Sequence, residues 1–121
     1  RCINPLIVHG QAHGAIVQGV GQAMGEAIVV DSASGQCYSG SFMDYRMPRA
    51  SDLPMFATEI IEVLSPTNPL GVKSGGEGGT TPALAVYVAA IVDALQPYGV
   101  TDMALPVTAQ SIFRAIHPFT S

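Results

Sequence analysis

The feature that most constrains this chain is an apolar run that follows directly on a glycine-rich segment. The run extends from Ala83 to Leu95, and Asp93 is its single charged residue. Proline is favoured in the first turn of a helix and threonine is a good cap, so Pro82 with Thr80 or Thr81 before it predicts a helix start. Because the run is apolar on nearly all sides, the helix is expected to be buried. It is too short to cross a bilayer, which takes about 20 residues.

The glycine-rich segment places one carboxylate, Glu77, between the pairs Gly75–Gly76 and Gly78–Gly79. Glycines lack the Cβ atom that would keep a ligand away from the backbone. Unsatisfied N–H groups at the start of the following helix favour negative charge nearby. Two interpretations stay open on these residues alone. Glu77 either caps the helix, which is the common use of such a carboxylate, or is a base held on an accessible loop.

A second helix is predicted over residues 11–28, where apolar residues recur at spacings of three and four. Several glycines interrupt it, among them Gly14 and Gly19, and each costs roughly 0.5–1 kcal/mol relative to alanine. The expected gain is the close approach of another helix or of a ligand. Gln11 and Gln18 are two helical turns apart. Their amides can bind a polar cofactor or simply face solvent, and the spacing does not decide between these.

Three other chemistries are disfavoured. His9 and His13 could share a helix face in a zinc hydrolase, but the glutamate of an HExxH site is absent, so ordinary hydrogen-bonded histidines are expected. Cys2 and Cys37 form no CxxC pair that could hold an iron–sulfur cluster or zinc. The five basic residues are scattered and the net charge is −4, which makes nucleic acid an unexpected partner.

The remaining segments predict strands and a last helix. Residues 28–43 are expected to form a β-hairpin, Phe56–Leu64 a further strand, and Ala109–Ile116 a short helix capped by Thr108. The predicted fold class is therefore α+β: a glycine-rich helix, a β-hairpin, a further strand, a buried apolar helix and a short C-terminal helix. The strands would complete a sheet with residues outside this chain. Charged residues make up only 12%, against roughly 25% in typical soluble domains, so part of the surface is expected to be buried against other protein.

Four segments in this order resemble one family, and the likeness runs from Asn4 to Ile116. The chain resembles the C-terminal part of the molybdopterin-binding large subunit of the molybdenum hydroxylases, the group of xanthine dehydrogenase, aldehyde oxidase and carbon monoxide dehydrogenase. Residues 1–121 would then be the C-terminal segment of a molybdenum cofactor-binding domain. The segments are GQAHGAIVQGVGQA at 10–23, GSFMDYRMPRA at 40–50, SPTNPLGVK at 65–73 and GEGGT at 76–80.

The resemblance implies roles for four residues. Glu77 would be the general base beside molybdenum, and Gln11, Gly76 and Gly78 would bind the molybdopterin cofactor, with no residue of this chain a metal ligand. The base would assist oxidation of an electron-poor carbon, in an aldehyde or N-heterocycle, with water as the oxygen source.

The resemblance also implies partners. These are the remainder of the molybdenum subunit, iron–sulfur clusters and FAD in other domains or subunits, and a small-molecule substrate. No membrane span or signal peptide is visible, and a cytoplasmic location is expected. The chain alone would be inactive. A non-catalytic assembly module that keeps the fold is the alternative.

Overall fold

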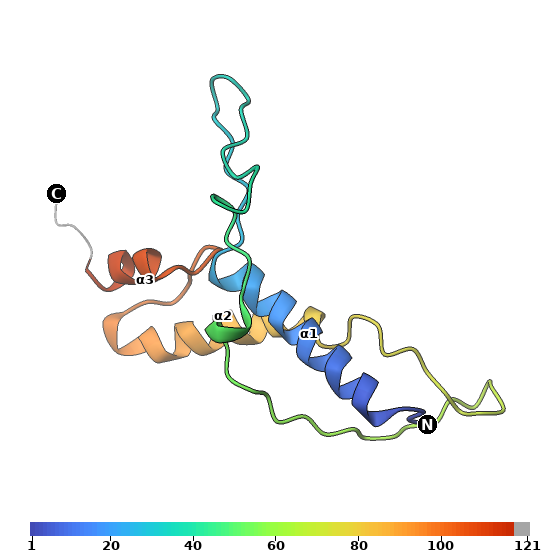
Figure 1. Ribbon diagram of the computed structural model, residues 1–121. Coiled ribbons are helices and arrows are strands. Elements are labelled where there is room, and N and C mark those ends of the chain that lie inside the picture. The colour runs from blue at the N-terminus through green and yellow to red at the C-terminus, as the bar shows by residue number, and fades with distance from the viewer. Residues whose placement is uncertain (118–121) are drawn as a thin grey trace.

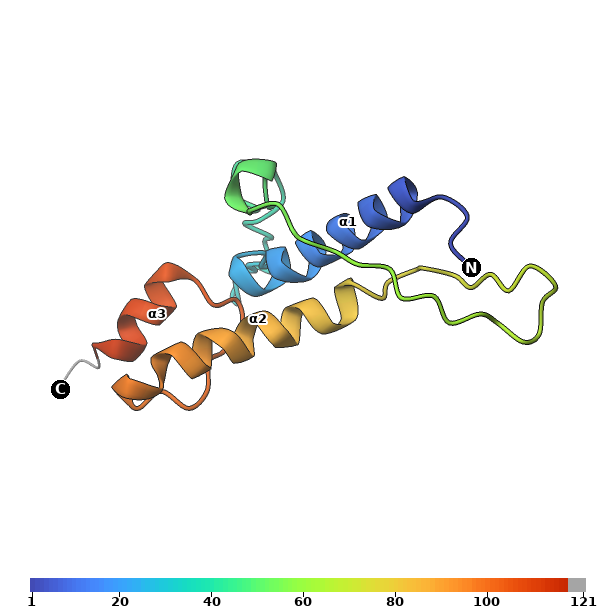
Figure 2. The same ribbon diagram turned by 90° about the horizontal axis from the view of Figure 1, so that it is seen from below.

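The computed structural model describes residues 1–117, and three α-helices dominate it (Figure 1). They are α1 (Pro5–Met24), α2 (Thr80–Leu95) and α3 (Ala109–Ile116), with the short 3₁₀ helices η1 (Ala50–Asp52) and η2 (Gln96–Tyr98) between them. Helices α1 and α2 lie against each other, an arm projects after α1, and a long loop runs from η1 past the N-terminal end of α1 before returning to α2 (Figures 1 and 2). The result is an elongated chain built on one helix pair.

The α1–α2 contact depends on glycine at two positions. A Cβ atom added at Gly19 would lie 2.8 Å from the Cβ of Ala83 and 2.9 Å from the carbonyl oxygen of Thr80. One added at Gly79 would lie 2.9 Å from the Cβ of Ala15. Real Cβ atoms do not approach this closely, so each glycine lets one backbone reach the other. The prediction that the glycines of the first helix permit a close helix approach is confirmed at Gly19.

The core that surrounds this contact is small. Its buried apolar side chains come from α1, from the end of α2 and from the segment before α3; they are Ala15, Val20, Ala23, Leu95, Val100 and Val107. The N–H of Val107 also donates to the carbonyl oxygen of Ala23 at 2.6 Å, which fixes the approach to α3 against the end of α1.

Helix α1 begins six residues earlier than predicted. The Asn4 side chain caps it by accepting from the N–H of Ile7 at 3.3 Å, and Pro5 occupies the first helical position. Asn-Pro is an efficient helix start, and the prediction that began the helix at residue 11 did not use it. His9 therefore lies inside the helix rather than before it, and the helix ends at Met24 rather than at Ile28.

Helix α2 occupies the predicted place, but two expectations about it are wrong. No side chain caps it: the residue at the N-cap is Gly79, and the Thr80 hydroxyl instead donates to the carbonyl oxygen of Ala15 at 3.0 Å. Nor is it buried within this chain, because Leu95 is its one buried residue and Val86 is 64% exposed. Over residues 1–117, no helix is both long and apolar enough to cross a membrane.

Helix α3 confirms its prediction at both ends. It spans Ala109–Ile116, and the Thr108 side chain accepts from the N–H of Ser111 at 3.1 Å.

The predicted strands do not form regular sheet, so the part of the chain described here is mostly helical and the α+β description with a hairpin is not confirmed. Residues 28–43 make a single antiparallel bridge, between Val30 and Cys37, around a turn at Asp31. Hydrogen bonds from Ser34 and Ala33 lower the pKa of Asp31 and hold this turn. Phe56–Leu64 runs without pairing to another segment of residues 1–117. A two-stranded ribbon has marginal stability unless a third strand pairs with it or one of its faces is covered. This explains why residues with high β-propensity do not form a regular ladder here.

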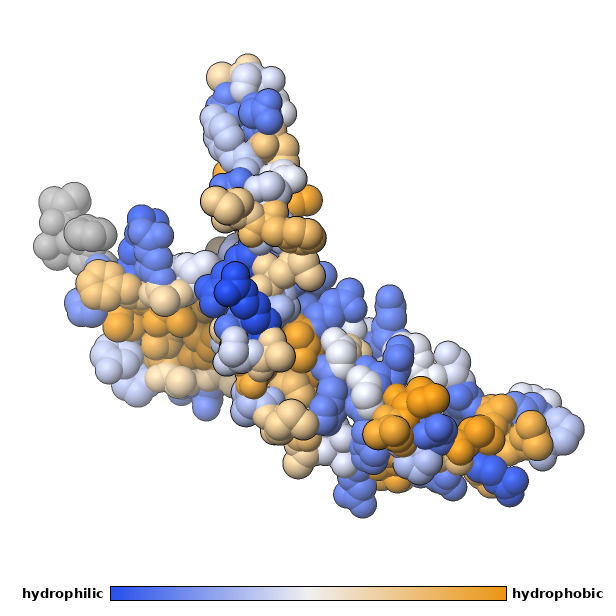
Figure 3. All heavy atoms as spheres, viewed as in Figure 1, coloured by the Kyte–Doolittle hydropathy of each residue, from blue (hydrophilic) through white to orange (hydrophobic). Residues whose placement is uncertain are grey.

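The chain exposes far more surface than a compact protein of its mass. Its accessible surface is 9009 Å², whereas a compact monomer of 12.5 kDa exposes about 6,200 Å². Figure 3 shows apolar patches on both the helical body and the projecting segments. The most exposed large apolar side chains are Leu6, Phe42, Met43, Met55 and Ile61. Patches of this extent are typical of surfaces that other protein covers.

The close contact at Gly19 yields a stability prediction. Gly19→Ala overpacks the α1–α2 crossing and should cost about 1–3 kcal/mol, whereas Gly14→Ala, whose Cβ meets nothing within 4 Å, should cost nothing. Thermal unfolding of the ligand-free full-length protein measures the difference. Gly19→Ala should lower the midpoint by several degrees relative to Gly14→Ala, and equal midpoints would show that the crossing is not tightly packed.

Candidate functional site

A hollow of about 380 Å³ lies between α1 and the segment that leads into α2. It brings together Gln11, Gln18 and Glu77, of which Glu77 is 59 residues beyond Gln18 in the sequence. The full lining is Gly10, Gln11, Gly14, Ala15, Gln18, Gly76, Glu77 and Thr80. The two amides, whose roles the spacing left open, thus share a hollow with the candidate base.

One face of α1 forms a wall of this hollow. Gln11, Gly14 and Gln18 follow each other at spacings of three and four, which places them in one row along the helix. A Cβ atom at Gly10 or Gly14 would meet nothing within 4 Å. These glycines therefore keep an open face of the helix flat, whereas Gly19, further along, serves helix packing.

The glycine-rich segment forms the facing wall. The Gln11 side-chain Nε2 donates to the carbonyl oxygen of Gly76 over 3.5 Å, a long hydrogen bond across the two walls. A second hollow, of about 560 Å³, also borders this contact. Its lining is mostly apolar or glycine: Ile7, Val8, Gln11, Ala12, Ala15, Gly75, Gly76, Gly78 and Gly79. Gln11 and Gly76 border both hollows, and Gly78 borders the second.

Glu77 lies in a turn just before α2, and its side chain is exposed. Its carbonyl oxygen accepts from the N–H groups of Thr80 and Thr81, at 3.0 and 3.2 Å. Since α2 has no side-chain cap, the carboxylate of Glu77 does not cap it, and the capping interpretation is not supported.

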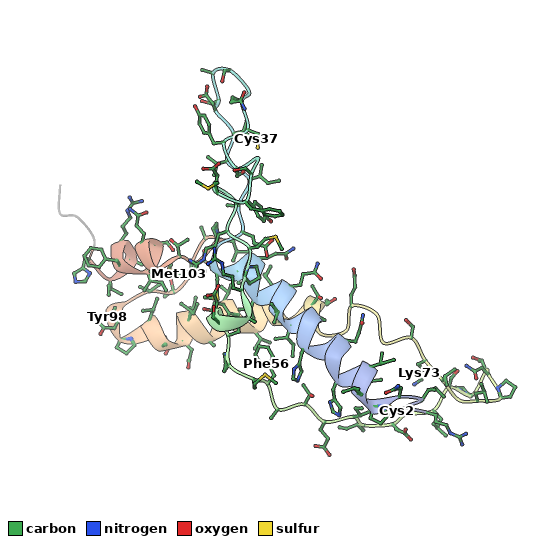
Figure 4. All side chains as sticks on the ribbon, in the orientation of Figure 1. Cys2, Cys37, Phe56, Lys73, Tyr98 and Met103 are labelled. Carbon is green, nitrogen blue, oxygen red and sulfur yellow. The ribbon has the colours of Figure 1, made fainter. Side chains whose placement is uncertain are left out.

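The two histidines lie away from this hollow and anchor a different segment. His9 Nδ1 lies 2.6 Å and His13 Nε2 3.4 Å from the hydroxyl oxygen of Thr58. The ring of His13 also meets Phe56 edge-on, with 5.8 Å between centroids; Phe56 is labelled beside α1 in Figure 4. Over the described part of the chain, no group of three or more His, Cys, Asp or Glu residues is placed to hold a metal ion. The histidines are hydrogen-bonded as expected.

The cysteines are free. Cys37 is exposed on the projecting arm, and Cys2 lies at the opposite end of the molecule (Figure 4).

The donors around the hollow suit a polar organic ligand. Two carboxamides each donate and accept hydrogen bonds, and the glycine backbone adds main-chain groups that no side chain covers. Such a set matches the mixed hydrogen-bonding edges of a pterin.

Comparison with known proteins agrees with this class of site. Residues 1–54 match the family of the molybdopterin cofactor-binding domain. Taken with the relatives described next, this match shows that the chain belongs to the molybdenum hydroxylases, within their molybdopterin-binding large subunits.

The relatives are similar over nearly the whole chain. The large subunit of nicotine 6-hydroxylase from Paenarthrobacter nicotinovorans is 40% identical over 113 residues, which cover 93% of this chain and 14% of that protein. The large chain of carbon monoxide dehydrogenase from Hydrogenophaga pseudoflava is 33% identical and covers 94% of this chain and 14% of its own length. The crystal structure of quinoline 2-oxidoreductase from Pseudomonas putida 86 superposes with a TM-score of 0.89 at 39% identity, over 96% of this chain and 15% of that one.

The chain thus spans about one seventh of the length of these curated relatives. The high TM-score also means that its elongated form is the form that the same segment has within a much longer protein.

Sequence reasoning missed two parts of the site. Gly10 and Thr80 line the hollow but were not singled out as site residues. Gly10 could have been found, because it lies one turn before Gly14 on the face defined by Gln11 and Gln18. Thr80 could not, since its role depends on a contact with Ala15, 65 residues away.

The hydrogen bond from Thr80 to α1 predicts which of the two threonines, Thr80 or Thr81, contributes more to stability. Thr80→Val keeps the shape but leaves the Ala15 carbonyl without this donor, at a cost of about 0.5–1.5 kcal/mol. Thr81→Val is the matched control, because the Thr81 hydroxyl only reaches Glu77 in its own turn. Thermal unfolding of the full-length protein should give a lower midpoint for Thr80→Val than for Thr81→Val. The reverse order would contradict the proposed anchoring of α2.

Proposed function

We propose that this chain is the part of a molybdopterin-dependent hydroxylase that supplies the catalytic base, Glu77, and one wall of the cofactor site. The observation that carries the proposal is the meeting of Gln11, Gln18 and Glu77 at one hollow from two distant segments. Family membership supports the cofactor, and the glycine-lined walls support close approach of a planar ligand. When bound, the molybdenum cofactor supplies the two-electron oxidation.

Each residue has a defined task in this proposal. Gln11 binds the cofactor through its carboxamide, with Gly76 and Gly78 leaving their backbone open to it. Glu77 takes a proton from the oxygen nucleophile as that oxygen attacks an electron-poor carbon of the substrate. Water is the source of the oxygen that is added. An exposed turn suits this task, since the carboxylate is open to a ligand and is not engaged in capping.

The substrate class we propose is an aromatic N-heterocycle. Nicotine 6-hydroxylase and quinoline 2-oxidoreductase, both named for N-heterocyclic substrates, are 40% and 39% identical to this chain. Carbon monoxide dehydrogenase is 33% identical. The ring carbon beside a heterocyclic nitrogen is electron-poor, which is the property that the base-assisted attack requires.

The proposed partners follow from the greater length of the relatives and from the exposed apolar surface of this chain. The remainder of a large molybdenum subunit would cover the exposed apolar patches, and iron–sulfur and flavin subunits or domains would carry the electrons away. Both relatives named as a large subunit or large chain support an assembly of several chains.

A substitution of the base tests the proposal directly. Glu77→Gln keeps the size of the side chain but removes its basicity, so turnover in the assembled enzyme should fall by about 10²- to 10⁴-fold while molybdenum and pterin content stay unchanged. Glu59→Gln is the matched control, because Glu59 is an exposed glutamate outside the hollow, and it should retain wild-type turnover. Full turnover of Glu77→Gln would remove Glu77 from the mechanism and favour the alternative, a non-catalytic assembly module.

The cofactor role of Gln11 has its own measurement. Gln11→Ala should lower the amount of molybdenum and pterin that copurify with the assembled protein. Gln22→Ala, on the same helix but outside the hollow, should not. Equal cofactor content in the two variants would show that the Gln11 amide does not hold the cofactor.

A further inference from the structure

The turn that carries Glu77 contacts one turn of α1 on both sides of the glutamate. Before it, the Gln11 Nε2 donates to the carbonyl oxygen of Gly76 over 3.5 Å. After it, the Thr80 hydroxyl donates to the carbonyl oxygen of Ala15 at 3.0 Å. Gln11 and Ala15 are four residues apart within α1, so both contacts fall on the same turn of a regular helix.

A close backbone approach strengthens the contact on the far side of Glu77. A Cβ atom added at Gly79 would lie 2.9 Å from the Cβ of Ala15 and 3.1 Å from the carbonyl oxygen of Ala12. Gly79 therefore lies directly against α1. Because residues 76–80 form a short span between two points on the same helix, the backbone at the centre of the span can move little.

The backbone of Glu77 is also held within its own turn. Its carbonyl oxygen accepts from the N–H groups of Thr80 and Thr81, at 3.0 and 3.2 Å, and from the Thr81 hydroxyl at 3.3 Å. The Glu77 side chain, in contrast, is exposed. A fixed main chain with an accessible carboxylate suits a base that must be placed accurately and must still exchange its proton.

We propose that Thr80 and Gln11 are positioning residues for the Glu77 carboxylate, and that both affect turnover through it. The inference rests on the proposed function, in which Glu77 is the base. Proton transfer and attack depend steeply on geometry, since a misplacement of about 1 Å can reduce the rate about 100-fold. The two contacts with α1 are therefore expected to contribute to the rate as well as to stability.

Gln11 would have a second task beside cofactor binding. A carboxamide has two N–H donors and one carbonyl acceptor. One N–H is directed to Gly76, which leaves the other N–H and the Oε1 atom for the cofactor. The same side chain would thus contact both the cofactor and the residue next to Glu77, and would set the spacing between them.

The kinetics of Thr80 variants of the assembled enzyme test the first positioning residue. Thr80→Val should lower kcat by about tenfold or more, with KM and molybdenum content within about twofold of the wild type. Thr80→Ser keeps the hydroxyl and should retain about half or more of the wild-type kcat. Thr101→Val, at an exposed threonine outside the hollow, should retain wild-type turnover. An unchanged kcat in Thr80→Val, or an equal loss in Thr80→Ser, would overturn the inference.

A double variant shows whether Thr80 acts through Glu77. In a Glu77→Gln background, Thr80→Val should cause no further fall in kcat, because the two substitutions remove the same contribution. A loss that multiplies with that of Glu77→Gln would show that Thr80 acts by another route, which overturns its positioning role.

Crystal structures of the assembled protein without its cofactor test both contacts independently of catalysis. Thr80→Val and Gln11→Glu each remove a donor at nearly constant side-chain size. Each should shift the Cα atom of Glu77 by about 0.5 Å or more from its wild-type place, the tolerance of a functional site. An unshifted Cα atom in either variant would overturn the role of that residue. Full turnover of Glu77→Gln would instead overturn the proposed base, so the two failures are distinguishable.

Discussion

The close crossing of α1 and α2 is the contact on which the rest of the structure depends. Because Gly19 has no Cβ atom, the backbone of α1 can approach Ala83 of α2 more closely than any other residue would allow. Gly79 in the same way lets the start of α2 approach Ala15 of α1. The Thr80 hydroxyl locks the same point by donating to α1. Because Glu77 lies three residues before Thr80, this crossing sets where the carboxylate lies relative to Gln11 and Gln18.

Glycine has two separate uses in α1, and they explain why so many are tolerated in one helix. Gly19 loses helix propensity and gains a backbone contact, whereas Gly10 and Gly14 lose the same propensity and gain an open face. The first use is stabilising within this chain. The open face at Gly10 and Gly14 does not stabilise this chain, which is consistent with a face that is free for a ligand.

The sequence predicted the parts of the fold that depend on local signals. The cap of α3 at Thr108 and the position of α2 follow from residues next to each other, and both were predicted correctly. The signal for the start of α1 was equally local, but the predicted helix began at residue 11 and the Asn4-Pro5 pair, a good helix start, was not used. The hairpin and the strand at 56–64 could not be judged from composition, because a strand requires partners that residues 1–117 do not provide.

The residues of the candidate site also divide into those that the sequence could predict and those that depend on a distant partner. Gln11, Gly76, Gly78 and Glu77 were named from their resemblance to the family, and the structure brings Gln11, Gly76 and Glu77 to one hollow. Thr80 was missed because its partner is distant in the sequence, and Gln18 was left undecided because spacing cannot tell a ligand from solvent. Their catalytic and cofactor roles stay predictions.

A crystal structure of the assembled enzyme with its cofactor and a heterocyclic substrate analogue would test the central claim most directly. The account predicts cofactor density against the Gln11 face of α1, with the Glu77 carboxylate within hydrogen-bonding reach of the reacting centre, directly or through one water. Cofactor bound elsewhere, or a Glu77 side chain turned away from the hollow toward solvent, would contradict it.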